Sequence, residues 1–378
     1  MAVPFFDIHY NLDEDTRRAL LARWERILEH GGFVNGPEVR ELESALAAFL
    51  GVPHVVCCSN GSDALVLALR AADVGPGDEV LVPAFTFFAS AGAIARVGAT
   101  PVFCDIDPRT FPLDFEDAAA RVTERTKAAM LVHLYGRAGD AVALGERLSA
   151  VAGRPVAVVE DAAQAIGAAH PAGPVGGMGV ASGWSCFPTK NLGAPGDAGF
   201  ATASDPEVAA RMARLREHGG GRQYHHDEVG YNFRMDSLQA AGLLQQLPRL
   251  LEFSAARRAG ADHYRALFTE HGLADRVILP EDDPGHVYHQ FVLRIEGGRR
   301  DALATALRER GIATAVYYPL ALHLQPCFAA LGGHPGMLAE AERATAEVMA
   351  LPIHPGITPE QREEVVAGFA ACLASAPA

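Results

Sequence analysis

Over about the first 205 residues the sequence alternates short apolar runs with segments of helical periodicity. Short apolar runs bounded by turn residues are typical of buried strands, and the segments between them have the spacing of amphipathic helices. This alternation predicts βαβ units and an α/β fold with a mainly parallel sheet covered by helices on both faces. The predicted strands are 52–58, 79–83, 101–105, 128–134 and 156–160, and the predicted helices are 63–72, 89–97 and 140–152.

A second unit begins where the pattern changes. From residue 235 to about 271 the pattern is helical and is interrupted by Pro248, which predicts a kinked helix leaving the first unit. We therefore expect a large domain over residues 1–250, including the N-terminal segment, and a small C-terminal α+β domain over residues 251–378. Its predicted strands are 287–295 and 312–318, and its predicted helices are 301–310, 339–349 and 359–374.

Composition excludes several classes of function. The formal net charge of -14 argues against nonspecific nucleic-acid binding, which requires a cationic face. The sequence starts without a basic region followed by an apolar run, and no apolar segment approaches about 18 residues, so we expect neither export nor membrane insertion and a cytoplasmic location. The six cysteines lack metal-type or disulfide-type spacing, which predicts reduced thiols and no metal site.

Lysine is the rarest basic residue, with two lysines against thirty arginines. An ammonium group with a tunable pKa can lose its proton and attack a carbonyl, whereas a guanidinium cannot. Lys190 lies in an otherwise uncharged stretch, 183–193, where a solvated charge is hard to explain. Lys127 precedes a predicted strand and has no comparable motif around it. Lys190 is therefore the first candidate for a Schiff-base residue; the alternative is a structural lysine in a loop.

Two predicted strands end in residues suited to binding a ligand, and ligands of parallel sheets bind beyond these ends. Gly61 and Ser62 open a helix, so their N–H groups and the Ser62 hydroxyl could hold a phosphate; a plain helix cap is the alternative. Asp161 follows a buried strand and needs a cationic partner, either an arginine or a protonated pyridine nitrogen. The sequence lacks a GxGxxG fingerprint after its first strand and a phosphate-binding P-loop.

Together these features describe one cofactor, pyridoxal 5'-phosphate. A helix N-terminus serves the phosphate, an aromatic side chain the ring face and Asp161 the ring nitrogen, and Lys190 follows 29 residues after Asp161 (190 minus 161). Several motifs in register also resemble the DegT/DnrJ/EryC1/StrS family of sugar aminotransferases over nearly the whole chain. They are Asn60-Gly61-Ser62-Asp63-Ala64-Leu65, Asp161-Ala162-Ala163-Gln164-Ala165, Pro188-Thr189-Lys190-Asn191-Leu192-Gly193 and Gly230-Tyr231-Asn232-Phe233-Arg234-Met235.

The resemblance implies the fold of type I PLP-dependent transferases, like that of aspartate aminotransferase, and a homodimer with active sites shared between subunits. It also implies transamination, because dehydratase relatives have histidine in place of this lysine. Phe87 would stack on the ring, although Phe85 and Phe88 compete for that role. The other implied roles are Lys190 for the Schiff base, Asp161 for the pyridinium, Gln164 for the phenolic oxygen, and Gly61, Ser62, Ser185 and the partner subunit's Asn232 for the phosphate.

For the substrate, the resemblance implies a nucleotide-linked ketosugar, closest to a dTDP-3-keto-6-deoxyhexose, with glutamate or glutamine as amino donor. We hypothesise that Arg222, Tyr224, His225 and His323 contact this substrate; a solvated loop and a core histidine are the alternatives. Close relatives often have tyrosine where this chain has Phe187, so one hydroxyl that could bind the sugar is absent. An aminocyclitol ketone as acceptor, and a non-enzymatic regulatory protein on the same fold, are the alternative functions.

Overall fold

The computed structural model describes residues 2–222 and 224–375, so Gln223, beside the predicted substrate residue Arg222, lies outside the described residues. Seven strands form the central sheet, in the order β1-β9-β8-β5-β4-β2-β3. Strands β8, β5, β4, β2 and β3 run parallel, whereas β9 is antiparallel to both β8 and β1. The strands are β1 (His54–Cys58), β2 (Glu79–Pro83), β3 (Thr100–Cys104), β4 (Thr126–Val132), β5 (Ala157–Asp161), β8 (Ala181–Ser185) and β9 (Gly199–Ala203).

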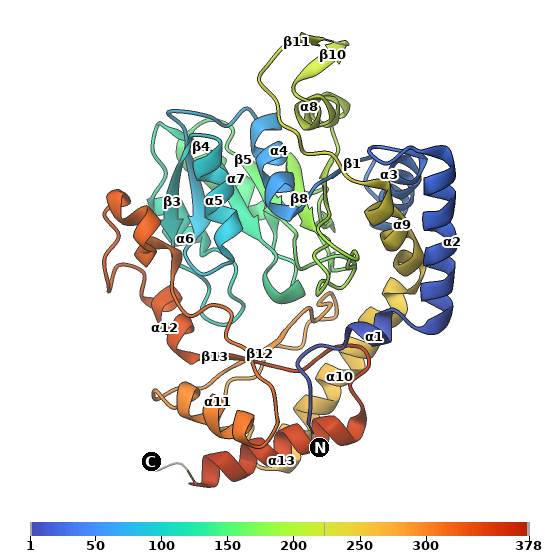
Figure 1. Cartoon of the computed structure of the whole chain (residues 1–378). Helices are drawn as coiled ribbons and strands as arrows, with labels where there is room; N and C mark the ends of the chain where they lie inside the picture. The colour runs from blue at the N-terminus through green and yellow to red at the C-terminus, as the bar shows by residue number, and fades with distance from the viewer. Residues whose placement is uncertain (1, 223, 376–378) are drawn as a thin grey trace.

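Helices cover both faces of this sheet, as the alternating pattern predicts (Figure 1). Val56 and Cys58 of β1 pack into the core beneath α4, α5 and α8, whereas Val55 and Cys57 pack on the opposite face with α3 and α9. This division follows from the two-residue period of a strand, which sends successive side chains to opposite faces. The helices of this unit are α2 (Glu14–His30), α3 (Pro37–Leu50), α4 (Gly61–Ala71), α5 (Phe88–Arg96), α6 (Phe115–Ala120), α7 (Ala141–Ala152), α8 (Pro206–Arg216) and α9 (Ser237–Gln246).

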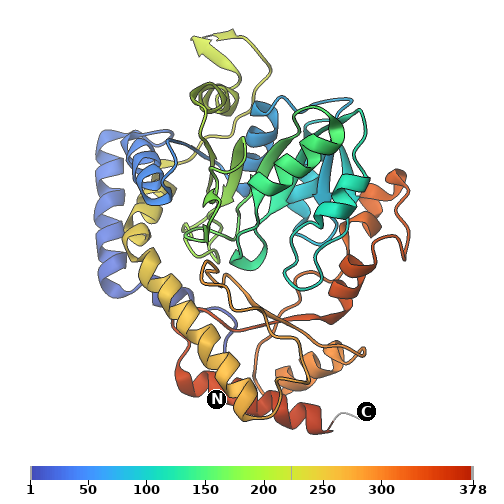
Figure 2. The ribbon, with the colours of Figure 1, turned by 180° about the vertical axis from the view of Figure 1, so that it is seen from behind.

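A broken helix connects the large unit to the small one. α9 ends at Gln246, a 3-10 turn (Leu247–Arg249) contains Pro248, and α10 (Leu250–Glu270) continues into the small unit. The kink predicted at the proline is confirmed. The small unit, most of which lies below the sheet in Figure 2, also contains β12 (Phe291–Arg294), α11 (Arg300–Glu309), α12 (Ala339–Glu347), β13 (Val348–Leu351) and α13 (Pro359–Ser375).

Two of the small unit's predicted elements differ from the structure. The predicted strand 312–318 is not a strand; Ile312 and Ala315 make isolated bridges only. The predicted strand 287–295 is shortened to β12, because the residues before it bond instead to the loop after β4: the N–H groups of Val287 and Gln290 donate to the carbonyls of Gly136 (3.0 Å) and Tyr135 (3.2 Å). Both segments thus stop pairing as strands where the small unit meets the large one.

The N-terminal segment packs with the C-terminal part of the chain. Val3 is buried in the small unit's core with residues of α10, α11 and α13, and its N–H donates to the Gly311 carbonyl at 2.9 Å. Val3, which lies in the predicted large domain 1–250, thus contributes to the core of the small unit. None of the described helices has the length and apolar character needed to cross a membrane.

Candidate active site

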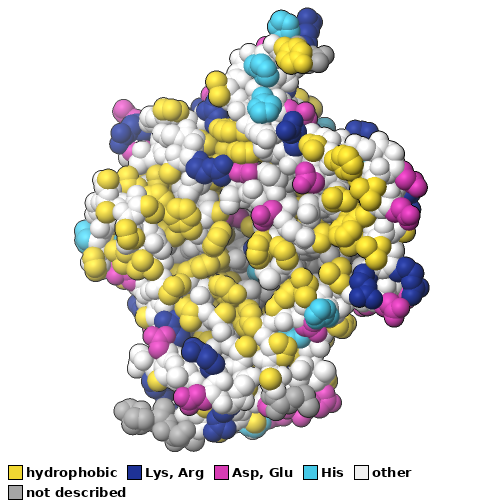
Figure 3. Space-filling model, viewed as in Figure 1, with side chains coloured by type: hydrophobic (Ala, Val, Ile, Leu, Met, Phe, Trp, Pro, Cys, Tyr) yellow, Lys and Arg dark blue, Asp and Glu magenta, His cyan; other side chains and the backbone are white. Residues whose placement is uncertain are grey.

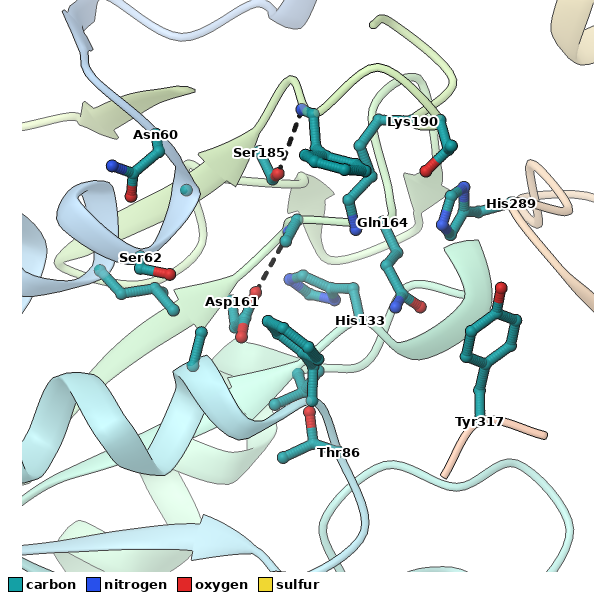
Figure 4. A pocket seen from close by; sticks show the side chains of 18 of the residues that line it. Asn60, Ser62, Thr86, His133, Asp161, Gln164, Ser185, Lys190, His289 and Tyr317 are labelled. Carbon is teal, nitrogen blue, oxygen red and sulfur yellow. Dashed lines mark hydrogen bonds between the residues drawn. The ribbon is translucent and has the colours of Figure 1, made fainter. Parts of the chain in front are cut away.

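The carboxyl ends of the parallel strands open into a cavity of about 620 Å³. Loops after β1, β2, β4, β5 and β8 form its walls, because these strands point the same way. The small unit closes one side with His289, Gln290, Tyr317 and Tyr318. The cavity therefore lies between the two units, and Figure 4 shows its side chains.

The N-terminus of α4 forms one end of the cavity. Asn60 caps the helix by accepting a hydrogen bond from the N–H of Asp63 at 2.9 Å. A Cβ atom on Gly61 would lie 2.6 Å from the Cβ of Ser185, so only glycine allows the helix to approach β8 this closely. The Ser62 and Ser185 side chains line the cavity beside this helix end (Figure 4). Free N–H groups, two hydroxyls and the helix dipole suit a phosphate group.

Asp161 lies at the end of β5, 4% exposed. It accepts hydrogen bonds from Ser90 Oγ (2.7 Å) and from the N–H of Ala163 (3.2 Å). Burial raises the pKa of Asp161, while Ser90, Ala163 and the charge of Lys190 oppose the rise. Within the described part of the chain no arginine pairs with Asp161; the lysine whose charge acts on it, Lys190, lines the same cavity, so a cationic group of a ligand there would complete its pairing.

Lys190 enters the cavity from the loop after β8. Burial lowers the pKa of Lys190 to about 8, although the negative charge of Asp161 partly offsets that effect. A neutral amine is thus accessible near neutral pH, as a nucleophile or proton-transfer group requires. Lys127, by contrast, pairs with Asp73 at 3.6 Å and is absent from the cavity lining.

Of the three candidate aromatic residues, Phe87 is the one that lines the cavity. Its ring lies 5.9 Å from that of Tyr318. Phe85 is buried in the core, and Phe88 stacks on Phe328 at 5.8 Å instead. Ala163 offers a small side chain to the same cavity, so a flat ring can lie against Phe87 above Asp161.

Gln164 is held in place by two hydrogen bonds. Its Oε1 accepts from the N–H of Tyr135 at 2.6 Å, and its Nε2 donates to the Tyr318 hydroxyl at 3.1 Å. Nε2 carries a second N–H that can serve a ring oxygen. The residues present therefore fit pyridoxal 5'-phosphate, with the phosphate at α4, the ring against Phe87, its nitrogen at Asp161 and its aldehyde at Lys190.

Several predicted substrate residues lie away from this cavity. Arg222, Tyr224 and His225 belong to a hairpin, β10 (Gly220–Arg222) and β11 (His225–His226), which projects from the large unit (Figure 1). Tyr224 is 87% exposed. Asn232, predicted to reach the partner subunit's phosphate, is also exposed and does not line this cavity. Within one chain none of the four can reach the site.

His323 is a core residue. It is 1% exposed, its Nε2 hydrogen-bonds with Glu342 at 3.2 Å, and its ring packs against Phe103. Because it is enclosed outside the cavity, we leave it out of the proposed substrate contacts. Tyr317 and Tyr318, just upstream, line the cavity instead.

Sequence reasoning missed Ser90, His133 and His289. His133 directly follows β4, so the rule that identified Asp161 at its strand end could also have identified His133. Ser90 lies in the first turn of α5, three residues after Phe87, which was a weaker signal. His289 comes from the small unit, and no local pattern connects it to Lys190.

The lysine, the carboxylate and the phosphate cradle are arranged for amino-group transfer, and the fold and site define a PLP-dependent aminotransferase. The chain belongs to the DegT/DnrJ/EryC1/StrS aminotransferase family, whose sequence model matches residues 14–370. The resemblance, the fold type and the cofactor expected from the sequence are thereby confirmed.

Similar proteins cover nearly the whole chain. A pleiotropic regulatory protein of Geobacillus stearothermophilus is 45% identical, over 97% of each chain. The UDP-N-acetyl-3-dehydro-α-D-glucosamine 3-aminotransferase of Acidithiobacillus ferrooxidans is 40% identical, over 98% of this chain and 97% of that protein. The crystal structure of DesV from S. venezuelae is 36% identical, covers 100% of both chains and has a TM-score of 0.92.

Proposed function

We propose that this enzyme transfers an amino group from glutamate or glutamine to carbon 3 of a nucleotide-linked ketosugar, with a dTDP-3-keto-6-deoxyhexose as the acceptor. The observation that carries the proposal is Lys190 beside Asp161 in a cavity that also offers a phosphate cradle. Bound pyridoxal phosphate supplies an electrophilic carbon and an electron sink. Lys190, as a neutral amine, would hold the cofactor through its aldehyde carbon and, once the amino group of the donor has replaced it there, would be free to move a proton at the substrate carbon; Asp161 would keep a proton on the ring nitrogen.

The names of relatives support carbon 3 more strongly than they support the nucleotide. Relatives that act on UDP-linked sugars carry 3-dehydro or 3-oxo in their names, and three dTDP-sugar transaminases carry 3-amino. A further relative is a GDP-perosamine synthase. For a 6-deoxy sugar, the aromatic side chains of Phe87, Phe187 and Tyr317 give the cavity a suitably apolar wall.

The diphosphate of such a substrate requires positive charge that the cavity wall lacks. Among the described residues that line the cavity, Lys190 is the only lysine or arginine. We therefore propose a homodimer in which Arg222 on the projecting hairpin serves the other subunit's site, together with Tyr224, His225 and Asn232. Hydrophobic side chains gather on the face of the chain seen in Figure 3, and the exposed large hydrophobic side chains of the chain include Leu28 at 67%. Exposed groups of this kind are suited to such an interface.

Visible absorbance of the bound cofactor tests the acceptor. Glutamate should remove the band of the holoenzyme, and a dTDP-3-keto-6-deoxyhexose should restore it faster than the UDP-linked sugar. Restoration only by a UDP-linked sugar would mean that the acceptor carries UDP and not dTDP. Restoration only by a ketocyclitol would mean that the acceptor is not a nucleotide sugar. A protein that shows no change with any donor would support the regulatory role named for the Geobacillus relative.

Replacing Lys190 with alanine should lower turnover at least about 1000-fold, because nucleophile and proton-transfer group are lost together. Lys127→Ala is the matched control, since that side chain pairs with Asp73 far from the cavity lining. Its turnover should stay within about twofold of the native value. Comparable losses in both variants would contradict the assigned role of Lys190.

Mixing two variants tests whether Arg222 acts across the subunit boundary. Lys190→Ala and Arg222→Ala homodimers should each be impaired in turnover with the nucleotide sugar. A mixed dimer would contain one site with intact Lys190 and the partner's intact arginine, so equal mixing should restore roughly a quarter of native activity. No recovery after subunit exchange would mean that Arg222 acts within its own chain or not at all.

A further inference from the structure

A small cavity of about 60 Å³ adjoins the active site. We call it the annex. It shares Thr189, His289, Gln290 and Tyr317 with the larger cavity, so the two meet beside Lys190. The rest of its wall comes from the N-terminal segment and the small unit: Phe5, Phe6, Arg257, Ile353 and His354.

Arg257 brings a buried positive charge to the annex. It is 3% exposed, and within the described part of the chain it pairs with no carboxylate. Its Nη1 lies 3.2 to 3.4 Å from the carbonyls of Tyr288, His289 and Ile353, whereas its Nε has no hydrogen-bond partner among the residues that the structure describes. Burial lowers the pKa of Arg257 to about 10. Burying a cation this deeply costs free energy unless an anion pairs with it.

His354 adds polar groups to the same wall. It is 3% exposed, and neither ring nitrogen makes a hydrogen bond of normal geometry to another described residue, although the Pro4 carbonyl is close enough to influence the pKa of His354. Burial, first, and the charge of Arg257 lower the pKa of His354, while Asp7 and Pro4 oppose that effect. The neutral imidazole carries one N–H that can donate. Arg257 and His354 thus leave unused donor capacity at one small cavity.

The annex lies away from the phosphate cradle. In Figure 4, Asn60 and Ser62 lie on one side of Lys190, and His289 and Tyr317 on the other. A carboxylate at the annex would therefore not compete with the phosphate at α4. An amino-acid donor must place its nitrogen at Lys190 while positively charged groups bind its carboxylates. The described lining of the main cavity contains no arginine that could do so.

We propose that the annex binds a carboxylate of the amino-acid donor, which Arg257 holds as counter-ion and His354 supports as a hydrogen-bond donor. This inference rests on the proposed function insofar as the donor is a carboxylate-bearing amino acid. It assigns donor recognition to the chain's own small unit, and sugar-nucleotide recognition to the hairpin of the other subunit. The two substrates would then be recognised by different sets of arginines.

Binding of glutarate to the holoenzyme, measured by titration calorimetry, tests the annex without turnover. Glutarate has two carboxylates and no amino group, so it cannot react. Arg257→Gln should weaken glutarate binding at least about 10-fold, the loss expected for one desolvated charge-assisted contact. The matched control is Arg258→Gln: Arg258, the next residue on α10, also bonds three carbonyls, those of Asp283, Pro284 and His286, but does not line the annex. Its binding of glutarate should stay within about twofold of native.

A second variant covers the case in which Arg257→Gln fails to fold. His354→Leu keeps the bulk of the side chain but removes its polar atoms, and it should weaken glutarate binding about threefold or more. Folded variants at both positions that bind glutarate like the native protein would overturn the annex. If the annex binds the donor, Arg257→Gln and His354→Leu should raise the half-saturating glutamate concentration, while the reaction with ketosugar keeps its rate. A native protein that binds glutarate at the annex but aminates no nucleotide sugar would instead refute the proposed function alone.

Discussion

Two neighbouring carboxylates at the end of β5 occupy regions with opposite roles. Glu160 is enclosed in a cage formed by His133 and residues 176–179, whereas Asp161 faces the cavity; both are almost fully buried. Glu160 accepts hydrogen bonds from the N–H groups of Gly176 (2.8 Å), Met178 (3.0 Å) and Gly179 (2.7 Å), and from His133 (2.9 Å). From the described residues Asp161 accepts two hydrogen bonds, donated by Ser90 and Ala163, and its remaining capacity faces the cavity.

The cage also fixes the state of His133. The N–H of Gly139 donates to His133 Nδ1 at 3.0 Å, so the ring proton is assigned to Nε2, which donates to Glu160. Every hydrogen bond around Glu160 thus comes from the protein itself. Burial alone therefore does not identify a functional carboxylate. Glu160 and Asp161 are both buried, but only the hydrogen bonds of Asp161 leave room for a ligand.

Asp161→Asn should have the largest effect on activity. Without the carboxylate nothing keeps a proton on the ring nitrogen, so a loss of about 3 kcal/mol, or ~100-fold or more in kcat, is expected. Stability should hardly change, because the unpaired charge is costly to bury in the free protein. Steady-state kinetics and thermal unfolding of the same preparation check both halves. If Asp161→Asn instead lowered the stability of the protein and left the turnover per folded molecule at the native value, Asp161 would have the structural role that we assign to Glu160.

Glu160→Gln should show the reverse pattern. An amide cannot accept from all four donors, and its own N–H groups would face those of Gly176 or His133. We expect the free energy of unfolding to fall by about 3 kcal/mol. Urea unfolding followed by circular dichroism measures this loss. Turnover per folded molecule should remain within about threefold of native, and a much larger fall would place Glu160 in the catalytic machinery.

The pH dependence of Lys190 separates the two carboxylates further. Because burial lowers the pKa of Lys190 to about 8, the neutral amine should increase about tenfold per pH unit up to that value and then level off. The rate at which protein freed of cofactor captures pyridoxal phosphate measures this profile. Asp161→Asn should move the midpoint below 8, because the Asp161 charge raises the pKa of Lys190. Glu160→Gln should leave it in place; a midpoint near 10 in native protein would contradict the assignment.

Ser90→Ala should have the smallest effect. It removes one of the two hydrogen bonds to Asp161 while the carboxylate keeps its charge for the ring nitrogen. Weakening of cofactor binding by about three- to tenfold is expected, measured by equilibrium dialysis. Thr86→Val is the control, since Thr86 contacts Ser90 Oγ at 3.1 Å but has no hydrogen bond to Asp161. An equal loss in the control would mean that the hydroxyl network, and not Ser90 itself, positions Asp161.

Local patterns in the sequence were sufficient to predict the sheet, its strand ends and the residues that those ends carry. Hydrophobic periodicity and strand-end position are local properties, so β2 was predicted at its observed bounds and Asp161 and Gly61 were identified as candidates. Lysine scarcity selected two positions, and the neighbouring motif distinguished Lys190 from Lys127. The structure brings Lys190, Asp161, Gln164, Phe87, Gly61, Ser62 and Ser185 to one cavity.

Contacts between segments that are distant in the sequence establish what closes the cavity and which polar groups lack partners. Segment 312–318 has the periodicity of a strand, yet Tyr317 and Tyr318 wall the site, because docking of the two units outweighs local propensity. His323 stands in a motif but is enclosed by Glu342 and Phe103, whereas His289 has no motif and lies beside Lys190. Whether a buried polar group is satisfied depends on contacts between distant segments, as Arg257 and Glu160 show, and no local pattern in the sequence specifies such contacts.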